Sequence, residues 1–73
     1  MTNCPPAPIH VYFVLQDNNL ISDWGGPADA LRIANRYLQQ QGLPARFISH
    51  FVGAREHTVC SVGVTLSGLH PLP

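Results

Sequence analysis

The sequence predicts an α/β fold: a strand–helix–strand unit of a parallel sheet, followed by a short β-hairpin. Three segments support this prediction. A short, almost continuously apolar run comes first, a longer run with apolar residues at helical spacing follows, and a third run is rich in β-branched and aromatic residues. Strand, helix and strand in this order, over about forty residues, form a βαβ unit with a right-handed crossover.

The first strand is expected over residues 9–15, IHVYFVL. Prolines precede this run, and the loop-forming residues QDNN follow it. A continuous apolar run of this length is typical of a strand that is buried on both faces, as in parallel sheets. We therefore expect both faces of this strand to be covered.

A helix is predicted from Pro27 to Gln41. Proline is favoured at the first helical position because its missing N–H would be unpaired there, and Asp29 would then lie near the positive end of the helix dipole. Gly42 is expected to end the helix, and Pro44 prevents its continuation. The predicted apolar face consists of Ala30, Leu31, Ile33, Ala34, Tyr37 and Leu38.

The second strand is expected over residues 45–52, ARFISHFV, which are rich in strand-forming side chains. After Gly53, the segment TVCSVGVTLS is typical of two short extended pieces around Val62-Gly63, which predicts a hairpin or a bent strand. The last residues, GLHPLP, are predicted to form a loop, and the proline-rich residues 1–8 a disordered leader.

These elements leave the predicted sheet incomplete. One helix covers one face of a two-stranded sheet, whereas the first strand carries apolar side chains on both faces. We therefore expect residues 9–73 to be the N-terminal fragment of a larger α/β domain that is truncated after Pro73. The chain alone should be marginally stable, oligomeric or prone to aggregation, so its expected partners are the remainder of the domain or further copies of itself.

The composition excludes several classes of function. The 73 residues have no net charge, and their four dispersed arginines do not form the basic cluster that a nucleic-acid surface requires. No nucleic-acid binding is expected through this segment. The longest apolar run is too short to cross a bilayer, and the N-terminus lacks the pattern of a signal peptide. We therefore expect no membrane association and a cytoplasmic location.

Neither a metal nor a cofactor is predicted. Cys4 and Cys60 are the only cysteines, and a disulfide between them would be unusual in a reducing compartment. His57 and Cys60 have the spacing of half a metal site, but no second pair follows. Gly25-Gly26 belongs to neither of the glycine-rich phosphate-binding motifs, so a phosphate site is not expected there.

The segment SDWGGPADALRIAN, residues 22–35, places an acid shortly before the predicted helix. Two interpretations of Asp23 remain open from the residues alone. It is either an acid stabilised by the dipole of the helix N-terminus, or a carboxylate facing a pocket beyond the carboxyl end of the first strand. Trp24 beside it could be part of the core, form a wall of that pocket or anchor a partner.

The order of residues in this segment resembles the ThiJ/PfpI superfamily, whose members have the class I glutamine amidotransferase-like fold. The shared pattern is an acid, two variable residues, Gly-Pro and a helix opening with Ala-acid-x-Leu, here residues 23–31. Ala34-Asn35, together with Gly63 in SVGVTL, resembles in particular the N-terminal domain of GlxA-like AraC-type transcriptional regulators. The resemblance spans residues 9–73 but only the opening of the family domain, and it implies a flavodoxin-like parallel sheet.

In that superfamily the acid of this loop approaches a cysteine on a tight strand-to-helix turn much later in the chain. Asp23 is the matching position, while the turn with the cysteine has no counterpart here. Cys60 lacks the glycine-flanked elbow of such a nucleophile and is expected in a strand. The candidate residues of a small-molecule pocket are therefore Asp23, Trp24, Gly25 and Gly26, and no catalytic residue is predicted.

The resemblance implies that the chain is the N-terminal fragment of the ligand-sensing or dimerisation domain of an AraC-type transcriptional regulator. The fragment would be non-catalytic, and the DNA-binding helix-turn-helix region would lie well beyond Pro73. Two alternatives remain. One is the N-terminal part of a cysteine-dependent hydrolase or isonitrile hydratase-like enzyme of the same superfamily, and the other is a truncated product without an independent function.

Overall fold

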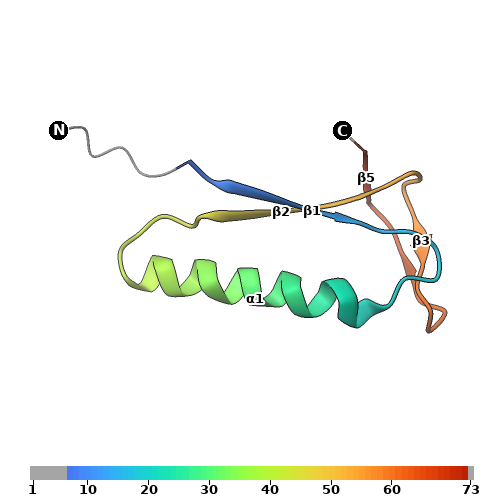
Figure 1. The fold of residues 1–73 in the computed structure, drawn as a ribbon, viewed down its shortest axis with the longest axis horizontal. Coiled ribbons are helices and arrows are strands. Elements are labelled where there is room, and N and C mark those ends of the chain that lie inside the picture. The colour runs from blue at the N-terminus through green and yellow to red at the C-terminus, as the bar shows by residue number, and fades with distance from the viewer. Residues whose placement is uncertain (1–6, 73) are drawn as a thin grey trace.

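One long helix runs along one face of a narrow parallel sheet, and a small hairpin lies at the end of that sheet (Figure 1). The computed structural model describes residues 7–72. Residues 1–6, which belong to the predicted leader and include Cys4, lie outside this range. The elements in chain order are β1 (Ile9–Val14), α1 (Ile21–Gln40), β2 (Phe47–Gly53), β3 (Thr58–Val59), β4 (Thr65–Leu66) and β5 (His70–Pro71). The mixed α/β class is confirmed.

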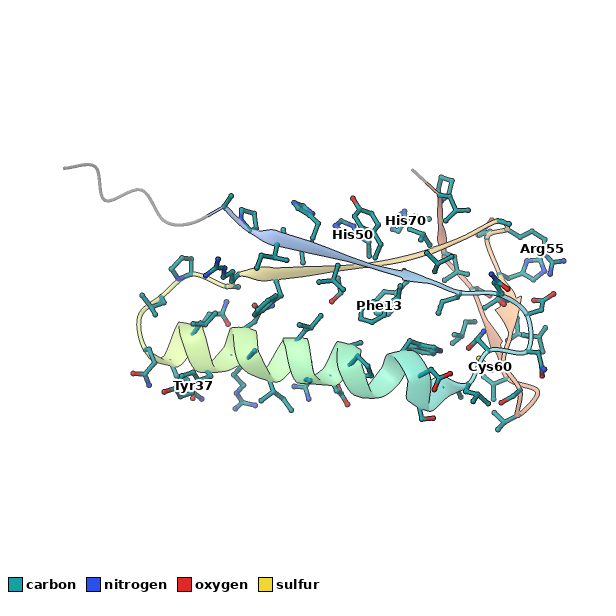
Figure 2. All side chains as sticks on the ribbon, in the orientation of Figure 1. Phe13, Tyr37, His50, Arg55, Cys60 and His70 are labelled. Atoms are coloured by element: carbon teal, nitrogen blue, oxygen red, sulfur yellow. The ribbon has the colours of Figure 1, made fainter. Side chains whose placement is uncertain are left out.

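The predicted strand–helix–strand unit is present. β1 and β2 pair in parallel, from Ile9 opposite Phe47 to Val14 opposite Val52, and α1 forms the connection between them. Because side chains alternate along a strand, each strand presents one set of residues to α1 and the other set to the opposite face. Figure 2 shows Phe13 between the sheet and the helix, and His50 on the face that α1 does not cover.

α1 begins at Ile21 rather than at the predicted Pro27, which lies inside the helix. Proline removes one backbone hydrogen bond from a helix interior, the one that would reach the carbonyl of Asp23, so the sequence pattern favoured a start at Pro27. The extra turns are held by the Trp24 ring, which packs edge-on against Phe51 with centroids 5.8 Å apart. Tertiary packing therefore outweighs the local cost of the proline.

The other end of α1 follows the prediction closely. The helix ends at Gln40, and Gly42 has a φ of +77°, a left-handed conformation that glycine adopts without steric cost. The N–H of Gly42 donates to the Gln39 carbonyl at 3.0 Å, and that of Leu43 donates to the Leu38 carbonyl at 2.9 Å. These bonds satisfy carbonyls of the last turn that would otherwise lack partners.

The predicted hairpin is also present, but the end of the described chain is not the predicted loop. β3 and β4 pair in antiparallel fashion, and Gly63, with a φ of +86°, lies in their turn. His70 and Pro71 form β5, which pairs in parallel with Val52 and Gly53 of β2. Proline lacks an N–H, but it is compatible with a strand at the edge of a sheet. The sheet thus has three strands, in the order β1-β2-β5.

The buried core lies at the carboxyl end of the sheet rather than between the helix and the strands. Its apolar members are Leu15, Val52, Cys60 and Leu69. No residue of α1 is buried, and Tyr37, predicted on the apolar face, is 62% exposed and points away from the sheet (Figure 2).

The prediction that β1 is buried on both faces is wrong for the described residues. Tyr12 and Val14 are 49% and 55% exposed, because residues 7–72 place no layer over the face opposite α1. The same part of the chain contains no helix whose length and hydropathy would let it cross a membrane.

Candidate functional site

The loop between β1 and α1 is fixed to the hairpin by backbone hydrogen bonds. The N–H of Asn18 donates to the Val59 carbonyl at 2.6 Å, and the N–H of Ser61 donates to the Asn19 carbonyl at 2.8 Å. Asn18 has a φ of +67°, a conformation that asparagine tolerates better than most residues. The loop at the carboxyl end of β1 therefore has a defined shape before any ligand binds.

Asp17 is the polar centre of this attachment. Its carboxylate accepts hydrogen bonds from the Val59 N–H at 3.1 Å and the Thr58 hydroxyl at 3.0 Å, and it forms an ion pair with Arg55. The Val59 N–H lowers the pKa of Asp17 below its usual range, and Thr58 and Arg55 lower it further, against the opposite effect of burial. Asp17 thus stabilises the loop as a carboxylate.

The first turns of α1 are joined to the same loop. The Trp24 indole Nε1 donates to Asn19 Oδ1 at 2.9 Å, and Asn19 Nδ2 donates to the Gln16 carbonyl at 2.6 Å. With its ring against Phe51 as well, Trp24 fixes the direction in which the helix leaves the loop. These contacts support a packing role for Trp24 within the chain.

A hollow of about 370 Å³ lies beside β1 at its carboxyl end, and its lining includes Asp23 and Trp24. Tyr12 and Phe13 of β1 and the asparagines of the loop also belong to its lining. The Asp23 side chain is exposed and, among residues 7–72, has neither a hydrogen-bond partner nor an ion-pair partner. The hollow thus offers a carboxylate with free acceptor oxygens.

The four predicted pocket residues are not brought together. Asp23 and Trp24 line the hollow, whereas Gly25 and Gly26 do not. A Cβ added at Gly25 would meet Ile21 Cγ2 at 3.4 Å, and one added at Gly26 would meet nothing within 4 Å. The two glycines separate because all four residues belong to a helix, whose successive side chains point in different directions.

A second polar cluster occupies the face of the sheet that α1 does not cover. His10 Nδ1 and His50 Nε2 are 2.8 Å apart, and the Tyr12 ring is stacked on His50 with centroids 4.6 Å apart. The centroids of the two imidazoles are 5.1 Å apart and their planes differ by 21°, so the two nitrogens meet head-on. This is the geometry of a hydrogen bond between the two imidazoles rather than of two lone pairs converging on a metal.

The remaining candidates have no metal or nucleophilic arrangement in the part of the chain that the structure describes. No group of three histidine, cysteine or acidic side chains lies close enough to hold an ion there. Cys60 is the first residue of the hairpin turn, since its carbonyl accepts from the Gly63 N–H at 2.9 Å, and it is only 2% exposed. Cys60 therefore has no access to a substrate in this structure.

The Asp17 network was missed at the level of sequence, where QDNN indicated only a loop. The partners of Asp17 lie 38 to 42 positions further along the chain, so no local spacing connects them. Comparisons with models of protein families, with curated proteins and with solved structures found no match to this chain. The resemblance to the ThiJ/PfpI superfamily therefore remains a prediction.

Proposed function

We propose that the chain is the N-terminal segment of a ThiJ/PfpI-like domain, part of the ligand-sensing or dimerisation domain of an AraC-type transcriptional regulator, and non-catalytic in itself. The observation that carries the proposal is the Asp23 carboxylate, which lines a hollow at the carboxyl end of β1 and has no partner among residues 7–72. Open α/β sheets bind their ligands at this end of the strands.

The lining of the hollow supports a small polar ligand with an apolar part. A carboxylate accepts hydrogen bonds and donates none, so the ligand must present an N–H, an O–H or a cationic group to Asp23. The lining also includes apolar residues such as Val14, Leu20 and Trp24. A ligand of this kind would exchange its hydration for a charge-assisted hydrogen bond and apolar contacts.

The open edge of β1 supports the assignment to a larger sheet. Leu15 donates its N–H to the Val52 carbonyl across the sheet, so residues at alternate positions of β1 direct their backbone groups to the other side. Those residues are His10, Tyr12 and Val14, and no strand of the described chain pairs with them. A further parallel strand at this edge would also close the hollow beside Asp23.

The burial of Cys60 supports the non-catalytic part of the proposal. Reactive cysteines are partly exposed and lie next to groups that stabilise the thiolate, whereas Cys60 is enclosed in the core with Leu15, Val52 and Leu69. The enzyme alternative requires a thiol that can reach a substrate in the hollow. A thiol ester hydrolysis or isonitrile hydration that Cys60→Ser abolishes would overturn the non-catalytic assignment.

An NMR titration tests the ligand site. We expect methylammonium, a cationic donor, to shift the Trp24 indole and Asn19 amide signals, and acetamide, a neutral donor, to do so more weakly. Asp23→Asn should weaken methylammonium binding about tenfold, because a charge-assisted hydrogen bond is lost. Asp29→Asn is the matched control, since Asp29 lies on the same helix and is already bound to Arg32 at 3.1 Å. Equal effects of the two variants, or no shift at Trp24, would remove the support for the site.

A further inference from the structure

The outer side of α1 carries apolar residues that the sheet does not cover. The sequence predicts one broad apolar face for this helix, but the structure divides it. Leu31 and Leu38 are half-buried, whereas Ile33 and Tyr37 are 57% and 62% exposed, and Ala30 is exposed with them. Figure 2 shows Tyr37 pointing away from the sheet. The apolar surface of α1 is thus wider than the part that the sheet covers.

The exposed residues are spaced like the contact positions of paired helices. Gly26, Ala30, Ile33 and Tyr37 follow one another at intervals of four, three and four positions, and all four are exposed. These intervals keep them on one side of a helix, and they are the intervals between the apolar contact positions of a coiled coil. We call these four residues the outer stripe.

Two opposite charges flank the outer stripe. Asp29 and Arg36 are seven positions apart, so they lie on the same side of the stripe, with the acid nearer the N-terminus of α1. Arg36 has neither a hydrogen-bond partner nor an ion-pair partner among residues 7–72. Asp29 is bound to Arg32 at 3.1 Å, but its side chain is 69% exposed and keeps free acceptor positions.

We propose that a second copy of this chain docks on the outer stripe, with its α1 antiparallel to this α1 about a two-fold axis. Ala30 then lies opposite the partner's Ile33, and Gly26 lies opposite the partner's Tyr37. The helix surface is open at Gly26, because a Cβ added there would meet nothing within 4 Å, and it therefore has room for the ring. The two-fold axis repeats both contacts, so apolar layers line the whole stripe.

The flanking charges favour the antiparallel arrangement. In this arrangement Asp29 meets the partner's Arg36, and the same ion pair forms a second time across the axis. A parallel pair of helices would instead bring Asp29 to the partner's Ala34 and would leave Arg36 without a partner. Exposed ion pairs contribute little to affinity, but opposite charges that face one another fix the orientation of two docking surfaces.

A second copy meets the requirements that the outer stripe sets for a partner. The surface is complementary to itself, as a two-fold interface requires, and the chain has no net charge, so two copies do not repel one another. Because the stripe faces away from the sheet, the two sheets lie on the outer sides of the joined helices. None of the four stripe residues lines the hollow beside Asp23, so the interface and the proposed ligand site can each fail without the other.

Sedimentation equilibrium on the full chain, over about a hundredfold range of concentration, tests the interface. We expect a reversible dimer. Ile33→Glu should weaken it at least about tenfold, because the dimer would bury a carboxylate opposite the partner's Ala30. Gln39→Glu is the matched control, since it makes the same change of charge at an exposed residue that lines the groove between α1 and β2. It should leave the dimer unchanged.

A pair of charge reversals tests the register. Arg36→Glu places two acids opposite one another in its own dimer, and Asp29→Arg places two arginines there, so each variant alone should associate more weakly than the wild type. A mixture of the two variants restores both ion pairs, and it should form a heterodimer more tightly than either variant forms a homodimer. Circular dichroism reports whether each variant keeps its helix, and glutamate favours a helix more than isoleucine does.

Three results would overturn the inference. They are a wild-type chain that stays monomeric throughout the concentration range, a dimer that Gln39→Glu weakens as much as Ile33→Glu does, and a mixture of Arg36→Glu and Asp29→Arg that associates no more tightly than the separate variants.

Discussion

The carboxyl end of the sheet and the layer formed by α1 and the strands differ in what holds them together. At the carboxyl end, four apolar residues are buried, and the Asp17 network joins the β1–α1 loop to the hairpin. In the helix–sheet layer no residue of α1 is buried, and Ile33 and Tyr37 are largely exposed. The only helix among residues 7–72 and the buried core are thus found in different parts of this chain.

This difference shows that a long helix does not by itself create a core. A helix lying on a narrow sheet touches it along one stripe, so most of its surface stays in water. The loops at the carboxyl end enclose Leu15 and Cys60 from several directions, and their polar backbone groups find partners in one another. The carboxyl end should therefore contribute more to the free energy of unfolding than the helix–sheet layer does.

The largest effect is expected from removing a side chain of the buried core. Leu69→Ala should lower the free energy of unfolding by about 2–5 kcal/mol, because Leu69 is buried against Gly53 and the cavity would not refill. Leu38→Ala, in the half-buried stripe of α1, should cost less. Urea denaturation followed by circular dichroism measures both, and a larger loss for Leu38→Ala would reverse the comparison between the two regions.

A pH-dependent effect is expected from Asp17. Its pKa is lowered in the folded chain, so its contribution to stability is complete above the pKa of the unfolded chain, about 4, and is lost as the pH falls through the lower folded value. The urea midpoint should therefore drop in acid, and Asp17→Asn should make that drop smaller. Asp23→Asn is the control, and its urea midpoint should fall in acid as the wild-type midpoint does. If the midpoint of Asp17→Asn fell in acid as much as that of the wild type, the role of the Asp17 network would be contradicted.

The smallest effect is a gain of stability in the helix–sheet layer. Gly25→Ala should raise the free energy of unfolding by about 0.5–1 kcal/mol, because alanine favours a helix and its Cβ would meet Ile21 at an ordinary contact distance. Gly26→Ala should gain less, since Gly26 precedes Pro27 and a Cβ there is disfavoured in helical conformation. Thermal unfolding of the two variants measures the difference, and an equal gain would argue against the proline effect.

Much of the fold could be predicted from local patterns. The apolar run of β1, the helix end at Gly42 and the turn at Gly63 each depend on residues within a few positions of one another. The start of α1 could not be found in this way, because Trp24 makes its stabilising contacts with Asn19 and Phe51. β5 was missed because its two residues resemble a loop in composition and become a strand only beside β2.

The candidate site likewise has features that local sequence predicts and features that it does not. The position of Asp23 near the carboxyl end of the first strand follows from the order of strand, loop and helix, and local sequence is enough to predict it. The residues that line the hollow with Asp23 are determined by the side of α1 on which each one lies. Trp24 therefore lines the hollow, whereas Gly25 and Gly26 do not. The partners of Asp17 belong to a segment that is distant in the chain, so no local pattern connects them.

The sequence by itself determined the α/β class, the order of the elements and the residues that end the helix, because hydrophobic spacing and backbone preferences act over a few residues. Only the tertiary structure decided where the core lies, where the helix starts and which carboxylates have partners. Burial and hydrogen bonding between distant segments depend on how the chain folds back on itself. Local sequence patterns span only a few residues and therefore do not predict which distant segments meet.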